Sequence, residues 1–395
     1  MRGASLPRQL LRTLRRRQRA MVGLLGALVM HESPSTEKRA VDRLARFLAR
    51  EWRRRGARAR IGRVRLLRPP NAGSILRAEI FLGRGRPQGQ LLVLGHLDTV
   101  YPLGTLRRTP FRVQRGRAYG PGTVDMKSGL VQALFAVEAL QALRSRSFGT
   151  PPAKLVFLFT SDEEIGSAAG QPVIEREARR SRAVLVLEPA SGLRGALKTA
   201  RKGVGEFELL VEGRAAHAGI EPEKGVSATE ELAEQIVRLK RLARARQGIT
   251  INVGVIEGGT RTNVVAERAR AKIDVRIAKL GDRRGVERQL RRLRPVNPRA
   301  RLRITGGIKR PPLERTREVV RLFRHAQRLA REMGLRLEES STGGGSDGNF
   351  TAALGIPTLD GLGGVGGGAH SRGEFVLTRR MPERAALLAS LLLTL

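Results

Sequence analysis

Three short apolar segments of the chain each run directly into side chains that bind metals or transfer protons. They are residues 91–98 (LLVLGHLD), residues 154–160 (KLVFLFT) followed by SDEE, and residues 183–187 (AVLVL) followed by Glu188. Continuous apolar runs of this length are typical of strands that are buried on both faces. In open α/β sheets the carboxyl ends of the strands form the edge where ligands bind. We therefore expect an α/β fold with a mainly parallel sheet and a reactive site along that edge.

The first segment ends in a histidine and an aspartate two positions apart, His96 and Asp98. Alternate residues of a strand point to the same face, so the carboxylate can reach the imidazole. A carboxylate that orients a histidine is typical of a metal site. A lone histidine at such a position is more often an ordinary core residue, but the acidic ends of the other two segments favour a site here.

The absence of cysteine from all 395 residues limits the chemistry of this site. Disulfides and thiolate ligands are excluded, so any metal must be held by histidine, aspartate and glutamate. Such ligands suit hard or borderline ions, of which we expect zinc, cobalt or manganese. The chain has only five histidines. Two of them, His31 and His325, stand in no motif and are expected to be structural or solvated.

The formal net charge of +39 is the most unusual feature of the composition. Binding to nucleic acid or to an anionic membrane surface is one explanation of such a charge. However, the charge is spread along the chain, and aromatic residues make up only 4% of it, unlike a stacking platform for single strands. We expect an arginine-rich solvated surface that attracts anionic substrates, with no specific nucleic-acid partner.

The N-terminal region bears on where the protein is found. Residues 1–20 are basic and are expected to be irregular, and residues 21–30 (MVGLLGALVM) are apolar. Together they resemble a signal peptide, which would direct secretion, but no small-residue cleavage site follows. We therefore interpret residues 21–30 as a core helix. No stretch reaches the roughly 18 apolar residues of a membrane span, so we expect a cytoplasmic protein with no membrane partner.

The remaining pattern divides the chain into two domains. Residues 1–201 and 312–395 are assigned to a catalytic α/β domain. Outside the three apolar segments, its expected helices lie near residues 36–54, 127–143, 315–333 and 382–393, and its expected strands near residues 58–68 and 75–83.

The intervening residues 202–311 follow the order β-α-β-β-α-β of a split βαβ unit. The expected strands cover residues 206–212, 249–256, 268–277 and 301–305, and the expected helices cover residues 227–246 and 282–293. Residues 268–277 alternate between charged and apolar side chains, as is typical of a strand with one wet face. We expect this unit to form a second domain inserted into the first.

The chain carries enough acidic and histidine side chains near the three strand ends and in two later loops to hold two metal ions. They are His96, Asp98, Asp125, Glu163, Glu164, Glu188 and His370. Each ion could take one histidine, one terminal carboxylate and a share of a bridging carboxylate, which leaves one carboxylate as a general base. Two alternatives stay open here. Asp125 could be the N-cap of the helix that follows it, and Glu163 with Glu164 could form a solvated acidic turn.

Six motifs, in order along the chain, resemble those of the M20 metallopeptidases. They are residues 95–100 (GHLDTV), 120–129 (GPGTVDMKSG), 162–167 (DEEIGS), 187–189 (LEP), 213–219 (GRAAHAG) and 368–371 (GAHS). The resemblance is nearest to the glutamate carboxypeptidase branch. It implies a zinc-peptidase-like catalytic domain with a mixed, mainly parallel sheet, and an inserted ferredoxin-like (βαββαβ) lid and dimerisation domain.

The resemblance also implies which residues hold the metal. Asp125 would bridge two zinc ions in each subunit, and cobalt or manganese could replace zinc. One site would be completed by His96 and Glu188, and the other by Glu164 and His370.

The family pattern further implies two residues that act beside the metal. Asp98 would orient His96, and Glu163 would be the general base that takes a proton from water. The peptide bond from Asp125 to Met126 is expected to be cis, as in the family.

Residues in and next to the inserted domain are implied in substrate binding. His217 would reach the active site of a partner subunit and stabilise the oxyanion, which makes a homodimer part of catalysis. The alternative for His217 is a surface loop histidine. Asn263 would contact the substrate, and Gly345 would line the pocket with its backbone. Arg276 and Arg310 could each bind a carboxylate bidentately, although either could be plain surface charge in so basic a chain.

The implied function is hydrolysis of an amide bond next to a free carboxylate in a small molecule or peptide, with glutamate carboxypeptidase activity as the leading case. N-acyl-amino-acid deacylase, dipeptidase and desuccinylase activities stay open, because the motifs do not separate them. A basic polyanion-binding protein without enzymatic activity is the alternative from another class. The intact set of metal ligands and base argues against it.

Overall fold

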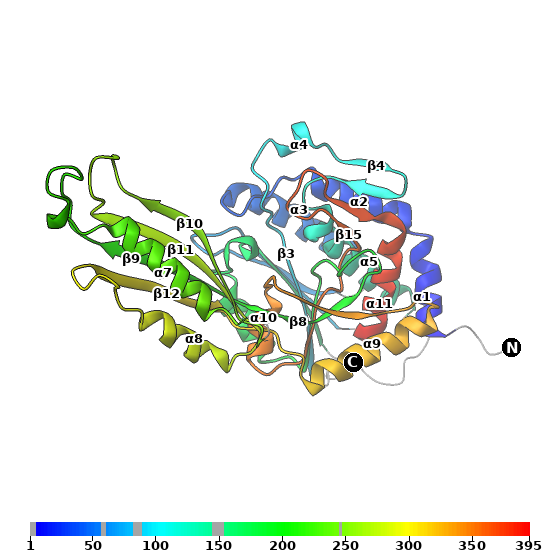
Figure 1. Cartoon of the computed structure of the whole chain (residues 1–395). Coiled ribbons are helices and arrows are strands. Elements are labelled where there is room, and N and C mark those ends of the chain that lie inside the picture. Colours follow the sequence, from blue (N-terminus) through cyan, green and yellow to red (C-terminus); the bar gives the residue numbers. More distant parts are fainter. Residues whose placement is uncertain (1–4, 57–60, 82–88, 144–153, 245–246) are drawn as a thin grey trace. The chain divides into compact units, whose positions relative to one another are not determined.

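The computed structural model describes residues 5–56, 61–81, 89–143, 154–244 and 247–395 of the chain (Figure 1). These residues form two compact units. The first unit comprises Met1–Ala200, Arg315–Ser341 and Ser346–Leu395, and the second comprises Arg201–Glu314 and Thr342–Gly345. The first unit is therefore assembled from segments on both sides of the second in the sequence.

The first unit is built on a six-stranded sheet with the strand order β1-β2-β6-β3-β7-β14. β3 is parallel to both of its neighbours, and β2 is antiparallel to β1 and β6. The expectation of an α/β fold with a mixed, mainly parallel sheet is confirmed. Parts of two predicted strands, residues 58–60 and 82–83, lie outside the described residues. The strands are β1 (Ile61–Leu67), β2 (Ile75–Ile80), β3 (Gln90–His96), β6 (Lys154–Thr160), β7 (Ala183–Val186) and β14 (Thr358–Leu359).

The central strand β3 is buried along its whole length because its alternate side chains enter different cores. Leu91 and Val93 pack with Trp52 in the larger core. Leu92 and Leu94 pack in a smaller core on the other face of the sheet. A strand covered on both faces has no polar side, which explains why this segment reads as a continuous apolar run.

Helices cover both faces of this sheet. The larger core receives α1 (Leu6–Arg15), α2 (Gln18–Val29), α3 (Lys38–Gly56), α5 (Ser128–Leu143), α9 (Arg317–Glu332) and α11 (Met381–Thr394). The smaller core receives α6 (Gln171–Ala178) and α10 (Gly348–Ala353). The helices predicted in this unit correspond to α2, α3, α5, α9 and α11. Among the helices of the described ranges, none combines the length and the apolarity that crossing a membrane requires.

The prediction that residues 1–20 are irregular is wrong, because α1 and the start of α2 lie there. Leu6, Leu10 and Leu14 recur every four residues and so share one face of α1. Leu10, Leu11 and Leu14 are at most 4% exposed, and α1 packs against α11, α5 and α9. Because arginines lie between the leucines, the sequence shows no continuous apolar run here.

Shorter elements complete the first unit. A four-stranded sheet has the order β15-β16-β5-β4, and β8 pairs with β13. The loop between β15 and β16 carries His370. The elements are α4 (Thr105–Arg108), β4 (Arg112–Gln114), β5 (Arg117–Tyr119), β8 (Leu197–Arg201), β13 (Glu339–Thr342), β15 (Gly366–Gly367), β16 (Phe375–Leu377) and the 3-10 turns Glu163–Ile165 and Thr378–Arg380.

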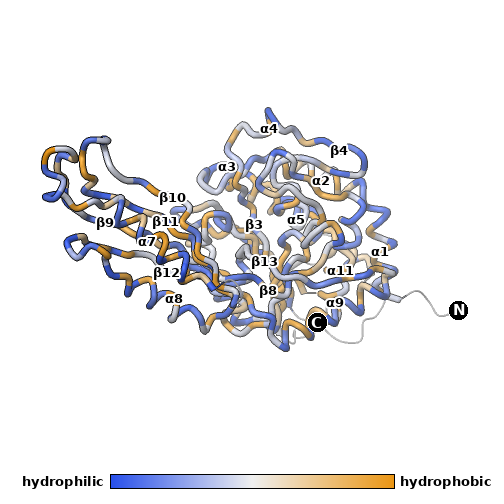
Figure 2. Tube along the Cα trace, viewed as in Figure 1, coloured by the Kyte–Doolittle hydropathy of each residue, from blue (hydrophilic) through white to orange (hydrophobic). Residues whose placement is uncertain are grey.

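The second unit is an antiparallel four-stranded sheet, in the order β10-β11-β9-β12, with two helices. One face of β11 is apolar, at most 3% exposed, and shares a core with α7 and α8. Figure 2 shows hydrophilic and hydrophobic residues alternating along both helices. The last residues of one predicted helix, 245–246, lie outside the described residues. The elements are β9 (Gly203–Glu212), the 3-10 turn Pro222–Lys224, α7 (Ala228–Leu242), β10 (Thr250–Gly258), β11 (Arg268–Ile277), α8 (Asp282–Arg291) and β12 (Arg301–Arg310).

Strand β12 extends to Arg310, although the prediction ends it at residue 305 before a pair of glycines. Gly306 has a φ of +102°, and a Cβ atom there would lie 2.1 Å from the backbone oxygen of Glu206. Only glycine fits such a close approach between neighbouring strands. Gly306 therefore allows the strand to continue past its predicted end.

Candidate metal centre

Three strand ends of the first unit deliver side chains to one edge of the sheet. β3 ends at His96, β7 ends just before Glu188, and β6 ends just before Glu163 and Glu164. His96 lies beside Thr160 in the register of the sheet, so the ends of β3 and β6 are level. Because β3 is parallel to both β6 and β7, the prediction that these strand ends share one edge is confirmed.

Asp125 reaches the same edge from the turn Thr123–Lys127, which precedes α5. The peptide bond from Asp125 to Met126 is cis, as expected. Gly122, just before the turn, has a φ of +72°, and a Cβ atom there would lie 2.8 Å from a threonine methyl group. This position therefore requires glycine. α5 begins only at Ser128, so Asp125 is not the N-cap of that helix.

The carboxylate of Asp125 lies between two histidines. One oxygen, Oδ1, is 3.3 Å from His96 Nε2, and the other, Oδ2, is 3.4 Å from His370 Nε2. His96 Nε2 is also 3.4 Å from Glu188 Oε1. His370 Nε2 is 3.2 Å from Glu164 Oε2. The structure thus brings the five predicted metal ligands together in two groups that share Asp125.

The donor atoms lie close enough together to hold cations. The ligand atoms of His96, Asp125 and Glu164 lie within 4.8 Å of one another, and so do those of His96, Glu163 and Glu188. Carboxylates at such distances repel one another unless cations or protons lie among them. Imidazole and carboxylate donors without thiolates suit zinc, cobalt or manganese. The residues present therefore fit divalent cations.

The same carboxylates control the protonation of both histidines. Contacts with Asp125 and Glu164 raise the pKa of His370 from its ordinary 6.5 to about 10. Burial disfavours the charged form of His96, but contacts with the surrounding carboxylates, Asp125 first, raise its pKa well above the ordinary value. The His370 imidazole of the metal-free protein therefore binds a second proton at neutral pH, and a cation must displace that proton.

Asp98 contacts His96 and the glutamate pair at once. His96 Nδ1 lies 3.0 Å from the backbone oxygen of Asp98 and 3.4 Å from its carboxylate Oδ1, which leaves Nε2 facing the site. The Asp98 carboxylate accepts hydrogen bonds from the backbone N–H groups of Glu163 at 3.2 Å and Glu164 at 3.1 Å. It also accepts one from Ser35 Oγ at 2.7 Å. These contacts fix the turn that carries both glutamates.

Sequence reasoning missed Glu374, which holds the turn that carries Asp125. Its side chain is buried, and its carboxylate accepts three backbone N–H groups between Gly122 and Asp125 at 2.8–3.0 Å. Tyr101 donates its hydroxyl to the same carboxylate at 2.6 Å. The sequence offers one signal for Glu374, which is its position four residues after His370.

His217 and Asn263 lie on neighbouring loops of the second unit. Both residues are exposed. The backbone N–H of Ala218 donates to the backbone oxygen of Asn263 at 3.0 Å, and His217 Nδ1 accepts from the backbone N–H of Gly219. The structure thus brings these two predicted residues together within their unit.

The two predicted arginines of the second unit differ in environment. Arg276 forms hydrogen bonds of 2.8 Å with the carboxylate of Asp274. Arg310 is 7% exposed and lies beside Gly345, where a Cβ atom would be 3.3 Å from Arg310 Cδ. The backbone oxygen of Gly345 accepts a hydrogen bond from buried Arg201 at 2.9 Å. Arg201 is a further buried cation that the sequence did not single out.

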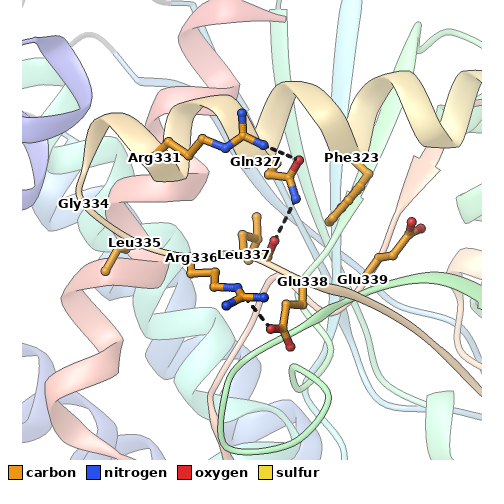
Figure 3. A pocket seen from close by; sticks show the side chains of 9 residues that line it. All are labelled: Phe323, Gln327, Arg331, Gly334, Leu335, Arg336, Leu337, Glu338 and Glu339. Atoms are coloured by element: carbon orange, nitrogen blue, oxygen red, sulfur yellow. Dashed lines mark hydrogen bonds and ion pairs between the residues drawn. The ribbon is translucent and has the colours of Figure 1, made fainter.

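A pocket of about 540 Å³ lies between α9 and the segment that follows it (Figure 3). Several of its polar groups bond to one another. Arg331 donates to Gln327, Gln327 donates to the backbone oxygen of Leu337, and Arg336 lies 3.4 Å from Glu338. None of the predicted metal ligands lines this pocket.

Comparison with known proteins identifies relatives along most of the chain. The family model described as peptidase family M20/M25/M40 matches residues 92–394. Carboxypeptidase G2 of Pseudomonas sp. (strain RS-16) is 30% identical over 384 residues, which cover 96% of this chain and 90% of that protein. Succinyl-diaminopimelate desuccinylase of Dechloromonas aromatica is 30% identical over 332 residues, 77% of this chain and 83% of that protein.

Solved structures share the fold. Aminopeptidase PepT from Bacillus cereus superposes with a TM-score of 0.77 at 22% identity, and the match covers 95% of this chain and 98% of that one. YxeP from Bacillus subtilis, described as a dinuclear metal binding peptidase, superposes with a TM-score of 0.67 at 15% identity, over 95% and 97% of the two chains. At these identities the structures establish the fold alone.

Proposed function

Because the chain belongs to peptidase family M20/M25/M40, we propose that it is a di-zinc hydrolase that cleaves an amide bond next to a free carboxylate. Glutamate carboxypeptidase activity is the leading case, since carboxypeptidase G2 is similar over nearly the whole length of both chains. The observation that carries the proposal is the position of Asp125, whose two carboxylate oxygens face His96 and His370 separately.

Each cation would have one imidazole, one terminal carboxylate and one oxygen of Asp125. His96 and Glu188 would hold one ion, and His370 and Glu164 would hold the other. Zinc is the proposed ion, with cobalt or manganese as substitutes. The description of YxeP as a dinuclear metal binding peptidase supports a pair of ions. When bound, the cations would acidify a water molecule and polarise the amide carbonyl.

The remaining carboxylate, Glu163, is proposed as the general base. Its carboxylate lies within 4.8 Å of ligand atoms of His96 and Glu188, and its backbone N–H is held by Asp98. Glu163 would accept a proton from the attacking water and transfer it to the leaving nitrogen. That transfer is required because an amide nitrogen leaves readily only when it gains a proton. His217 of a partner subunit would stabilise the oxyanion.

The proposed substrate class carries a free carboxylate beside the cleaved amide. Arg310 and Arg276 are the proposed carboxylate-binding residues, with Asn263 and the backbone of Gly345 completing the contacts. Arg310 is the preferred residue of the two, because it is buried beside Gly345. Deacylase, dipeptidase and desuccinylase activities are the alternatives, and the desuccinylase relative supports the last. The net charge of +39 would attract any such anion.

We also propose a homodimer formed through the second unit. β10 is an edge strand of its sheet. It exposes Val255 and Ile256 by 44% and 58%, and an exposed apolar edge favours pairing with another strand. We also propose a cytoplasmic location, which agrees with the packing of the apolar residues of α2 into the core.

The decisive experiment measures release of free amino acid from a panel of N-acylated amino acids and dipeptides. The panel is run with added zinc, with a chelator, and with the Glu163→Gln variant. Zinc-dependent release of glutamate that the variant lacks would support the leading case. Zinc-dependent release of another amino acid would move the protein to a deacylase or dipeptidase activity. No release by protein with two ions bound would contradict the proposal for this substrate class.

A further inference from the structure

We propose that Glu374 is a positioning residue for Asp125, holding the turn so that each Asp125 carboxylate oxygen faces a different histidine. This inference rests on the proposed two-metal function, because it assigns Glu374 the task of presenting the shared ligand. Glu374 itself contacts none of the side-chain ligand atoms in the hydrogen bonds described for it; its partners are backbone groups and Tyr101.

The carboxylate of Glu374 uses all of its acceptor positions, and three of its four hydrogen bonds come from the turn that carries Asp125. Oε1 accepts from the backbone N–H groups of Val124 at 2.8 Å and Asp125 at 3.0 Å. Oε2 accepts from the backbone N–H of Gly122 at 2.9 Å and from Tyr101 at 2.6 Å. A carboxylate has about four acceptor positions, so all are used. The side chain is only 1% exposed, so water cannot replace these bonds at low cost.

One of these bonds fixes the backbone of the shared ligand itself. The N–H that Asp125 donates to Glu374 belongs to the same residue whose carboxylate lies 3.3 Å and 3.4 Å from the two histidines. A small shift of that backbone would move both oxygens together. Site geometry of this kind must be held within about 0.5 Å to remain productive.

Glu374 also joins the Asp125 turn to the loop that carries His370. The backbone N–H of Gly120 donates to the backbone oxygen of Glu374 at 3.2 Å. Tyr101 donates to the backbone oxygen of Ser371 at 2.9 Å as well as to the Glu374 carboxylate. The two loops that supply Asp125 and His370 are therefore connected through one buried side chain, which sets the separation of these ligands.

The test is Glu374→Gln, which keeps the shape but replaces one acceptor oxygen with a donor NH2 group. That group must face N–H donors, so the turn loses at least one of its anchors. Substitution of a residue that orients a metal ligand typically lowers metal affinity or activity by about 10- to 100-fold. We expect the second equivalent of Co²⁺ to bind about 10- to 100-fold more weakly, with a changed visible spectrum of the Co²⁺-loaded protein. kcat should fall in the same range while KM stays within about threefold.

Two controls separate positioning from general destabilisation. Tyr101→Phe removes the hydroxyl that bonds both to Glu374 and to the backbone oxygen of Ser371, and it leaves the three backbone bonds of Glu374 in place. Glu231→Gln alters another buried glutamate that accepts backbone N–H groups, those of Val296 and Asn297, but lies in the second unit. Glu231→Gln should bind two Co²⁺ with affinities within about threefold of the unaltered protein, a change well below that expected of an orienting residue. Tyr101→Phe should weaken the second ion less than Glu374→Gln does, because the three backbone bonds of Glu374 remain.

Unchanged Co²⁺ affinity and spectrum in Glu374→Gln would overturn the inference. If that variant does not fold, Glu374→Asp, which keeps the charge but shortens the reach, should show the weakened second ion, and normal binding in it would overturn the inference equally. Unaltered protein that binds two Co²⁺ but hydrolyses nothing would contradict the proposed substrate class and leave the Co²⁺ comparison decisive for Glu374. Unaltered protein that binds only one ion would overturn both proposals.

Discussion

Ser35 Oγ donates a hydrogen bond to Asp98 Oδ2 at 2.7 Å, and both side chains are buried. The same carboxylate oxygen accepts the backbone N–H of Glu164 at 3.1 Å. Ser35 therefore restrains the carboxylate that contacts His96 on one side and the glutamate turn on the other. A residue that contacts no predicted metal ligand still bears on the geometry of two of them.

We expect Ser35→Ala to weaken Co²⁺ binding and to lower kcat by about two- to tenfold, because one such hydrogen bond contributes about 0.5–1.5 kcal/mol. Titration calorimetry with Co²⁺ and initial rates on the best substrate give the two values. Ser33→Ala is the matched control, since buried Ser33 donates to the backbone oxygen of Leu97 and not to Asp98. Equal effects of the two substitutions would contradict the role given to Ser35.

The sheet of the first unit was predictable because strands buried on both faces leave an unmistakable pattern in the sequence. β3, β6 and β7 appear as continuous apolar runs, and the ligand side chains stand where each run ends. The alternation of charged and apolar residues in β11 likewise predicted its exposed and buried faces. In each case the signal is local, since a few consecutive residues carry it.

Glu374 and Arg201 were missed because their partners are backbone groups far away in the sequence, so no local pattern marks them. Glu374 binds N–H groups about 250 positions earlier in the chain, and Arg201 binds backbone oxygens more than 140 positions later. A backbone donor or acceptor exists at nearly every position, so no residue type marks it. The error at α1 has a different cause. Arginines scattered among the leucines interrupt the apolar pattern, and only helical geometry brings Leu6, Leu10 and Leu14 to one face.

Substitution of Glu163 and of Glu164 by glutamine should affect different properties, turnover in the first case and metal affinity in the second. Glu163→Gln should lower kcat by about 10²- to 10⁴-fold, the usual contribution of a general base, and should still bind two metal ions. Glu164→Gln should instead lose affinity for one ion, because Glu164 Oε2 lies 3.2 Å from His370 Nε2. Metal analysis after dialysis, together with rates at saturating zinc, distinguishes the two effects.

The reverse pattern would exchange the assigned roles. If Glu163→Gln lost a metal ion while Glu164→Gln kept both ions but not turnover, Glu164 would be the base. Normal turnover by Glu163→Gln with both ions bound would remove the proposed base altogether.

The stability of the metal-free protein should depend on pH through His370. Its pKa in the folded state is raised, by Asp125 and Glu164, from an ordinary 6.5 to about 10. A raised pKa contributes stability that is fully present below pH 6.5 and is lost as the pH rises through about 10. The Tm measured with chelator should therefore decrease as the pH rises from 6.5 to about 10. His370→Gln should show a smaller fall, whereas His325→Gln, which alters a histidine outside the centre, should keep the original slope.

Metal binding should show the opposite dependence on pH. A cation displaces the proton on His370, so apparent affinity for Zn²⁺ should increase as the pH rises toward about 10. Calorimetry in two buffers of different ionisation enthalpy measures the protons released at each pH. An affinity that is constant between pH 6.5 and 9, with no proton release, would contradict the raised pKa of His370.

Complementation between two inactive variants tests whether His217 acts across a dimer. His217→Ala and Glu163→Gln should each be nearly inactive alone. In a mixed dimer, the site that keeps Glu163 receives His217 from the other subunit and is complete. Random exchange of equal amounts makes half of the dimers mixed, with one complete site of two, so about one quarter of full activity should return. No recovery after verified subunit exchange, or full activity of a monomer in light scattering, would show that His217 does not act in trans.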